Sequence, residues 1–311
     1  MTTDVSVIVV LYQSDIKKTF MTLNSIIRQL NVAFEIILSD DGSSIDISNE
    51  VETYLISNNF LEYKFLKHEK NVGTVKNCLD AVSVAQGEYV YVISPGDCLY
   101  DESTLKKMVD LVKEKKCDFC FGLAQYYSNR NGIFELYKNP YLVCPSVYQS
   151  DGYNCTIAKV NFFNENMPVG ASYLRKKRIF IEYLKKIVDK VIYIEDKSTS
   201  YMYILDNQKL FFFPHRVVWY EVGDGISTSS KGNEKLVKDS EEINKLIVSM
   251  YSEDFVVRYK IMNDHLIAWK ERILIEANYF YIRLMRKIKR MHSQMKSDKE
   301  QKERFDFMTT N

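Results

Sequence analysis

The stretch EIILSDDGSS (residues 35–44) runs from an apolar segment straight into two carboxylates and a turn. A short apolar run that stops at such a turn is typical of a β-strand buried on both faces. VSVIVVLY (residues 5–12) has the same character, as do YKFLK (63–67) and EYVYVIS (88–94). Helical spacing over residues 15–30 and 73–85 separates these runs, so the sequence predicts a mostly parallel α/β sheet with right-handed crossovers.

Polar or aromatic residues close three of these apolar runs. Tyr12 ends the first, Asp40 and Asp41 end the second, and Asp97 follows the fourth. The carboxyl ends of parallel strands meet at one edge of a sheet, where open α/β sheets bind their ligands. We therefore expect the functional site at this edge.

Composition excludes several classes of protein. The chain has 311 residues, of which 46% are hydrophobic, and its net charge is +1. Such a composition excludes a wholly disordered chain, and the balanced charge disfavours nucleic acid as a partner. The first residues, MTTDVSVIVV, lack the basic start of a signal peptide, and no apolar run reaches the roughly 18 residues of a membrane span. We expect a cytoplasmic protein, with peripheral contact at the inner membrane face as an option.

The six cysteines are scattered, and only Cys117 and Cys120 form a C-x-x-C pair. A zinc site would require a second pair at suitable spacing, which the sequence lacks. We interpret these two as reduced, partly buried thiols.

The remainder of the chain divides near residue 230. Residues 117–168 are irregular and aromatic, and VIYIED (191–196) is predicted as a further strand that ends in carboxylates. Nine apolar residues from Leu266 to Met295 follow the period of one long α-helix, and six Lys/Arg without any acidic residue lie between Arg283 and Lys296. This basic helix fits an anionic lipid surface, a partner or second copy, or a solvated cap on the domain. The last fifteen residues are predicted to fray.

Four motifs in order resemble family 2 glycosyltransferases with the GT-A fold. The family pattern is an apolar strand ending near an aromatic residue, then V-D-D-G-S, N-x-G-x-x-x-[AR]-N and a strand that ends in D-x-D-D. Here these read VSVIVVLYQ, LSDDGS, NVGTVKN and YVYVISPGD, and the likeness continues through VGASYLRKKRIF and IED to about residue 230. The resemblance implies a GT-A domain at 1–230, with a Rossmann-like sheet flanked by helices, and a helical extension at 231–311.

The resemblance also implies roles at the sheet edge. Tyr12 and the backbone of Val10 would hold the base of a nucleotide-sugar donor, and Asp41, in preference to Asp40, would bond a uracil edge. The remaining donor residues would be Asn71 and Gly73, which shape a loop, Lys76 near the base or phosphates, and Ser94 at the ribose. Asp97 would hold Mg2+ or Mn2+ on the donor diphosphate, since hard cations prefer oxygen ligands. Asp196, with Glu195 beside it, would act as general base in an inverting transfer to a glycan acceptor on a lipid carrier or a protein.

Departures from the family pattern keep alternatives open. SPGD retains one carboxylate where D-x-D-D has three, and no late histidine is matched, although His215 lies nearby and Asp224 is a possible substitute. Asp97 and the Glu195–Asp196 pair also suit helix caps, and Lys76 suits a solvated helix surface. The expected function is glycosyl transfer for a bacterial surface polysaccharide or glycoprotein glycan. The alternative is a catalytically silent GT-A partner protein.

Overall fold

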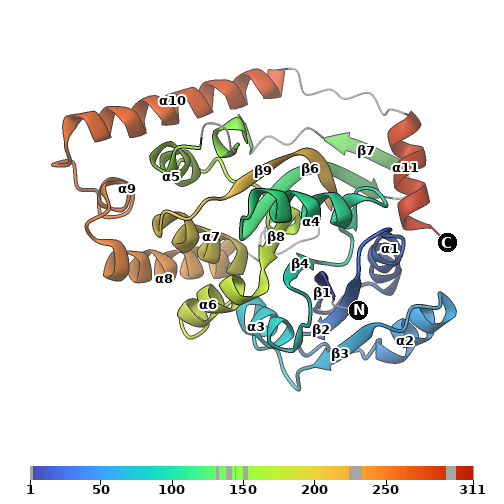
Figure 1. Ribbon diagram of the computed structural model, residues 1–311. Helices are drawn as coiled ribbons and strands as arrows, with labels where there is room; N and C mark the ends of the chain where they lie inside the picture. Colours follow the sequence, from blue (N-terminus) through green and yellow to red (C-terminus); the bar gives the residue numbers. More distant parts are fainter. Residues whose placement is uncertain are drawn as a thin grey trace.

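The computed structural model describes residues 3–130, 133–137, 142–143, 145–149, 153–223, 233–291 and 299–310. Its centre is a nine-stranded sheet in the order β3-β2-β1-β4-β8-β6-β9-β5, with β7 paired to β6 (Figure 1). The strands are β1 (Val5–Leu11), β2 (Phe34–Asp40), β3 (Tyr63–Lys67), β4 (Tyr89–Ile93), β5 (Cys98–Leu99), β6 (Phe119–Arg130), β7 (Ile133–Tyr137), β8 (Tyr173–Lys176) and β9 (Phe211–Glu221). The predicted α/β class is confirmed.

The helices are α1 (Ile16–Ile27), α2 (Ser48–Ser57), α3 (Thr74–Val84), α4 (Thr104–Lys115), α5 (Cys155–Phe163), α6 (Lys177–Ile187), α7 (Glu195–Leu205), α8 (Asn233–Tyr251), α9 (Phe255–Lys260), α10 (Trp269–Met291) and α11 (Lys299–Thr309). Two short 3-10 turns, η1 (Pro145–Tyr148) and η3 (Gly170–Ser172), complete the described elements. The predicted helices at 15–30 and 73–85 correspond to α1 and α3.

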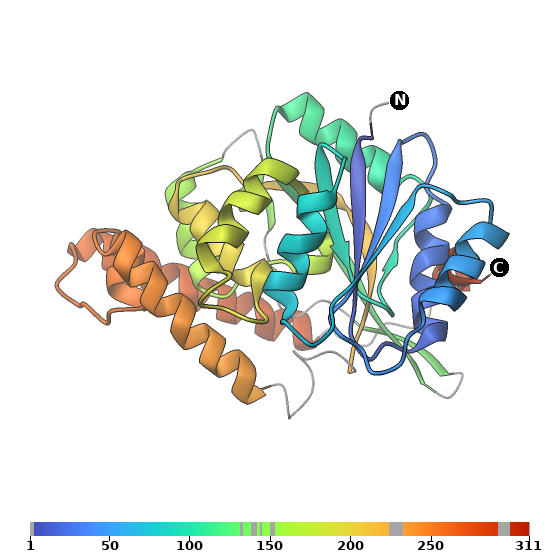
Figure 2. The ribbon, with the colours of Figure 1, turned by 90° about the horizontal axis from the view of Figure 1, so that it is seen from below.

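The sheet has a hydrophobic core on each face, because the side chains of a strand alternate between the faces. In β1, Val5, Val7 and Val9 pack in the core that α1, α2 and α4 cover, whereas Ile8 faces the core beneath α3, α6 and α7. Figure 2 shows helices on both sides of the strands. Burial on both faces explains why these strands read as continuous apolar runs.

The parallel register aligns the ends of the first strands. β1 pairs with β2 so that Leu11 lies opposite Asp40, and with β4 so that Val9 lies opposite Ile93. The next residues, Tyr12, Asp41 and Ser94, therefore follow neighbouring strands at one edge, as predicted. β8 enters beside β4 as an antiparallel strand and joins this half of the sheet to β6 and β9.

The segment VIYIED does not form the predicted strand. Residues 191–194 form an irregular connection, and Glu195 and Asp196 begin α7. The carboxylate of Asp239 on α8 accepts hydrogen bonds from the backbone N–H groups of Ile192 and Tyr193. These amides are thus satisfied by a side chain instead of a neighbouring strand, which a local apolar pattern does not reveal.

Residues 299–309 form α11, contrary to the prediction that the last fifteen residues fray. α11 returns to the first third of the molecule and packs on α1 (Figure 1), and Phe305 is buried against the rings of Tyr127, Phe134 and Trp219. The Asn24 side chain donates to the carbonyl oxygens of Met308 and of Thr310. This contact satisfies carbonyl groups that the end of a helix leaves without partners.

The predicted helix at 266–295 is confirmed from Trp269 to Met291 as α10, whereas Leu266 lies in the turn before it and residues 292–295 lie outside the described residues. Cys117 and Cys120 are buried and unbridged, as predicted. Among the described residues, no helix combines the length and the apolar character that crossing a bilayer requires.

Candidate active site

The loop after β2 is organised by its two carboxylates. One oxygen of Asp40 accepts from the backbone N–H and the hydroxyl of Ser43, at 3.0 and 2.6 Å, which shapes the DDGS turn. The other oxygen, Oδ2, is buried and has no hydrogen-bond partner among the described residues. A buried acceptor without a partner has a lone pair available for a ligand donor.

Asp41 holds the neighbouring loop. Its carboxylate accepts from the backbone N–H groups of Val72, at 2.6 Å, and Gly73, at 3.1 Å. Burial raises the pKa of this carboxyl group, and the two amide bonds act in the opposite direction. The structure thus joins Asp41 to the loop that contains Asn71 and Gly73, as the motif order led us to expect. Asn71 itself is exposed at the surface of this loop.

Gly73 has a positive φ of 89°, and a Cβ there would lie 2.2 Å from Cγ2 of Ile192. Glycine is therefore required both for the backbone conformation and for the close approach. The backbone N–H of Val75 also donates to the carbonyl of Ile192. This contact brings the donor-side loop against the segment that leads to Asp196.

Tyr12 is exposed at the end of β1, and Val10, partly buried, packs on the core beneath. The following residue, Gln13, adopts a positive φ of 49° and donates its backbone N–H to the hydroxyl of Ser43. The loops after β1 and β2 are thereby tied together. Gln13 was not among the predicted site residues, and its backbone role leaves no signal in the sequence.

The Lys76 side chain contacts a residue of its own helix, α3. Its ammonium group makes an ion pair with both carboxylate oxygens of Asp80, one turn further along α3. This is an ordinary i,i+4 pair on a helix surface. The structure therefore favours the surface interpretation of Lys76. Asn77, in contrast, exchanges two hydrogen bonds with Ser39 and fixes α3 to the end of β2.

Asp97 lies in a turn that α1 and β9 enclose. Its carboxylate accepts from the backbone N–H of Glu221 at 2.9 Å, and its backbone carbonyl accepts from the hydroxyl of Thr22 at 2.7 Å. Burial raises the pKa of Asp97 to about 8, and the negative charge of Glu221 adds to the increase. Ser94 is exposed beside this turn. The Asp97 side chain does not cap α4, whose N-cap residue is Ser103.

Glu221 is the carboxylate that sequence reasoning missed. It is the last residue of β9, and its Oε2 atom lies 2.7 Å from the ammonium nitrogen of Lys18 on α1. A Cβ on Gly96 would lie 2.3 Å from the same oxygen and would displace it, and the positive φ of 99° at Gly96 independently favours glycine. Glu221 reaches Asp97 across 124 positions of the chain, and this separation hid the pair from motif reading.

Glu195 and Asp196 begin α7, where negative side chains interact favourably with the helix dipole. Burial and the charge of Asp196 raise the pKa of Glu195. Asp196 approaches η3 so closely that a Cβ on Gly170 would lie 2.6 Å from its Oδ2 atom. Gly170 belongs to the VGASYLRKKRIF segment, whose role in the site comes from this approach.

A buried cation faces this second acidic pair. Arg175 on β8 is 3% exposed, and its guanidinium carbon lies 4.2 Å from the ring centre of Phe180 and 4.7 Å from that of Tyr173. Its charge lowers the pKa of Glu195 against the effect of burial. Arg175 Nε and Nη1 have no hydrogen-bond partner in the part of the chain that the structure describes.

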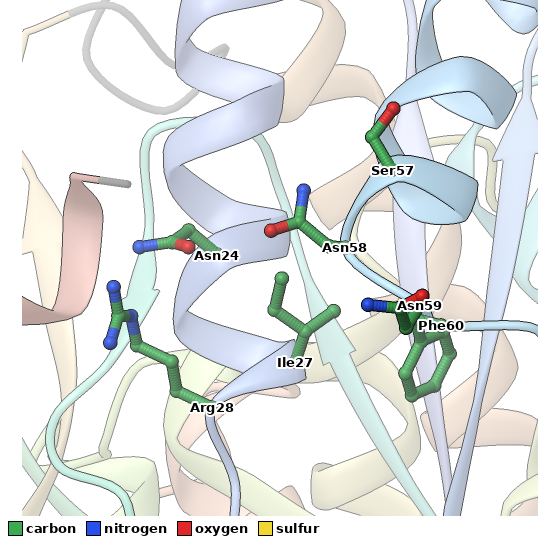
Figure 3. Close-up of a pocket in the computed structure, with 7 residues that line it drawn as sticks. All are labelled: Asn24, Ile27, Arg28, Ser57, Asn58, Asn59 and Phe60. Carbon is green, nitrogen blue, oxygen red and sulfur yellow. The ribbon is translucent and has the colours of Figure 1, made fainter.

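Two further candidates and one cavity are not part of the described site. His215 is exposed and contacts the ring of Phe213, and Asp224 lies outside the described residues. A cavity of about 600 Å³ lies between the carboxyl ends of α1 and α2 (Figure 3). Its lining contains no carboxylate or histidine. It lies at the ends of α1 and α2 that are remote from the carboxyl ends of the parallel strands. We assign no chemistry to this cavity.

Comparison with known proteins agrees with this geometry. The sequence profile of glycosyl transferase family 2 matches residues 6–184. Glycosyltransferase GlyG of Streptococcus pneumoniae serotype 4 is 26% identical over 133 residues, which are 43% of each chain. The chain thus spans less than half the length of this curated relative.

Solved structures of S. aureus TarS have the same fold. The complex of TarS residues 1–349 with UDP-GlcNAc has a TM-score of 0.56 and 17% identity, over 90% of this chain and 81% of that chain. The complex with UDP has a TM-score of 0.53 and 16% identity, over 90% and 80%. The predicted GT-A architecture is thereby confirmed. Because the family profile covers more than half of its residues, the chain belongs to glycosyl transferase family 2.

Proposed function

We propose that this protein transfers a sugar from a nucleotide sugar, and specifically a UDP-sugar, to a hydroxyl group of a glycan acceptor, with inversion at the anomeric carbon. One observation carries the proposal. The contact of Gly73 with Ile192 places the edge formed by β1 and β2 beside the segment that ends in Asp196. A nucleotide-binding edge and a base on the opposite side of the reacting carbon are what a single displacement requires.

The nucleotide part of the donor would bind at the ends of β1 and β2. Tyr12 offers an exposed ring for stacking, and Asp40 Oδ2 and Asp41 offer acceptors for the N–H of a pyrimidine. Ser94 would reach the ribose. TarS crystals contain UDP and UDP-GlcNAc on the same fold, which supports uridine as the nucleoside.

The proposal includes a divalent cation near Asp97. Mg2+ is commonly bound by one or two carboxylates, with phosphate and water oxygens completing its shell. Asp97 and Glu221 supply two carboxylates close enough for their charges to interact, although the described residues form no cluster of three potential metal ligands. Mg2+ or Mn2+ held there would neutralise the leaving diphosphate. Lys18 would add a second positive charge at the same end of the site.

Asp196 would accept the proton of the attacking hydroxyl group as its oxygen bonds to the anomeric carbon. The bond from that carbon to the diphosphate oxygen breaks in the same step, and the nucleotide leaves with its electron pair. Arg175 would hold the acidic pair in place through its charge. A positioned base of this kind contributes roughly 10²- to 10⁴-fold to a rate.

The acceptor belongs to the same proposal. We place the enzyme in the assembly of a bacterial surface polysaccharide or glycoprotein glycan, as a hexosyltransferase acting on a lipid- or protein-linked chain. A catalytically silent GT-A partner protein is the competing function, and the incomplete SPGD motif is the observation that favours it.

The test combines calorimetry and product detection. UDP is titrated into the purified protein with and without Mn2+, and then into Asp97→Ala. We expect binding that strengthens with Mn2+ and weakens in the variant. UDP-sugars are then screened for release of UDP, with Asp196→Asn expected to bind UDP normally and to lose at least about 100-fold in kcat.

Three results would change the conclusion. UDP binding that ignores both Mn2+ and Asp97 would remove the metal from the proposal. Normal turnover in Asp196→Asn would remove the base. A wild-type protein that binds no nucleotide would favour the silent partner.

A further inference from the structure

α10 presents its apolar residues to solvent. Large side chains at spacings of 4, 7, 4 and 4 residues fall on one face of the helix. Their exposed fractions range from 41% for Ile288 to 69% for Phe280, and the set is Trp269, Ile273, Phe280, Leu284 and Ile288. A surface helix normally turns such residues toward the core, so this outer face of α10 indicates a partner.

The opposite face fixes the orientation of the helix. Ile275 and Ile282, seven residues apart, are buried against the rest of the protein. The Asn164 side chain, at the end of α5, donates to the backbone carbonyl of Ile275 and to the side chain of Asn278. Figure 1 shows α10 along one margin of the molecule, beside α5. The outer face therefore points away from the domain because the inner face is held.

Positive charge accompanies this apolar face. Arg283 and Lys287 are exposed on the same half of α10. The sequence has no acidic residue from 277 to 297, whereas six Lys/Arg lie between 283 and 296. At the other end of the helix, Arg272 is paired with Glu276. Arg283 and Lys287 are thus the exposed cations of α10 that border this apolar face.

We propose that the outer face of α10 lies in the interface of an anionic lipid membrane. An exposed apolar stripe bordered by Lys and Arg, with Trp at one end, is typical of helices that lie in the plane of a bilayer surface. A second copy fits less well, because pairing two such faces would bring the basic halves near each other or near a helix end with little negative charge. This inference does not depend on the proposed function.

The experiment uses the full chain and two kinds of vesicle, one of phosphatidylcholine alone and one with added phosphatidylglycerol. We expect co-sedimentation with the anionic vesicles and at least about a tenfold loss in Phe280→Glu. Leu61→Glu is the matched control, because Leu61 is 71% exposed but lies on the connection between α2 and β3. The double variant Arg283→Glu/Lys287→Glu should lose the preference for anionic lipid.

Tryptophan fluorescence gives an independent measurement. The protein has two tryptophans, of which Trp219 is fully buried and Trp269 is on the outer face of α10. Anionic vesicles should shift the emission to shorter wavelength in the wild type and leave Trp269→Phe unchanged. Wild-type protein that stays in the supernatant with both vesicles overturns the proposal, as does undiminished binding by Phe280→Glu. A dimer that Phe280→Glu dissociates, without vesicle binding, would assign the face to a second copy.

Discussion

The candidate site contains two acidic pairs that resemble each other in charge and differ in how the chain builds them. Glu195 and Asp196 are adjacent in sequence and face the buried cation of Arg175. Asp97 and Glu221 come from distant parts of the chain and face Lys18, whose side chain is partly exposed. In each pair, burial raises the pKa of one carboxyl group, that of Glu195 or that of Asp97.

The comparison shows how a protein accommodates two neighbouring carboxylates beside one cation. When one carboxyl group of each pair keeps its proton, the remaining negative charge is balanced by the neighbouring Arg or Lys, and neither cluster carries a large unpaired charge. The two pairs differ in which parts of the protein contact them. Arg175 is buried between aromatic rings of its own part of the chain. The Asp97 turn, in contrast, contacts α1 and β9, and Tyr127 connects it to α11.

The largest expected effect tests that junction. Phe305 on α11 is 1% exposed and packs on Tyr127, whose hydroxyl donates to the carbonyl oxygen of Gly96 in the Asp97 turn. Phe305→Ala should lower the free energy of unfolding by about 3–5 kcal/mol, because truncating a buried Phe removes apolar contacts and leaves a cavity. It should also weaken UDP binding. Urea unfolding and calorimetry measure the two effects.

Phe307→Ala is the matched control, because Phe307 lies on the same helix and is half-exposed. We expect it to change stability by less than about 1 kcal/mol. Faster amide exchange in residues 299–310 of Phe305→Ala, without weaker UDP binding, would show that α11 and the Asp97 turn are independent.

A smaller effect concerns the proton on Asp97. Its pKa of about 8 exceeds its ordinary value of 3.8, so the folded chain binds this proton more tightly than the unfolded chain. The free energy of unfolding should therefore fall as pH rises from about 4 to about 8. Asp97→Asn removes this penalty and should stabilise the metal-free protein by a few kcal/mol near pH 8.5, and much less near pH 5.

Asp101→Asn should change the free energy of unfolding in the opposite direction. Hydrogen bonds from Ser103 and Thr104, with the charge of Lys107, lower the pKa of Asp101 despite its burial. Its contribution to stability is therefore present at neutral pH and is lost on acidification through that lowered pKa, so the variant should be less stable near pH 7. Urea unfolding across pH separates the two variants. Equal pH profiles for wild type and Asp97→Asn would contradict a raised pKa.

Much of the sheet edge could be predicted because its signals are local. Strands buried on both faces give continuous apolar runs, and the carboxylates that follow them are in the sequence at the point where the strands end. The same reasoning failed for VIYIED, because Asp239 on α8 supplies the acceptors that a strand partner would have provided. For Lys76 the role in donor binding stays a prediction, and the structure shows an ion pair with Asp80, one helical turn away.

What could not be predicted depends on contacts between distant residues. α11 is polar along most of its length. It is held by Phe305 and Met308, which are buried against residues that are distant in the sequence. Glu221 belongs to no sequence motif. Its position beside Asp97 follows from the contact between the end of β9 and the turn at Gly96. Local patterns record which residues are apolar, but not which surface will cover them.

The smallest expected effect concerns Lys18, the cation beside Asp97 and Glu221. Lys18 and Glu221 form their ion pair at 2.7 Å, with 28% and 14% of the side chains exposed. A partly exposed pair contributes little, so Lys18→Met should cost about 1 kcal/mol or less in urea unfolding. Because Lys18 lowers the pKa of Asp97, its removal should also move the pH dependence of stability to higher pH. Lys17→Met, one residue away and exposed, should do neither, and identical behaviour of the two variants would show that Lys18 does not balance the Asp97 pair.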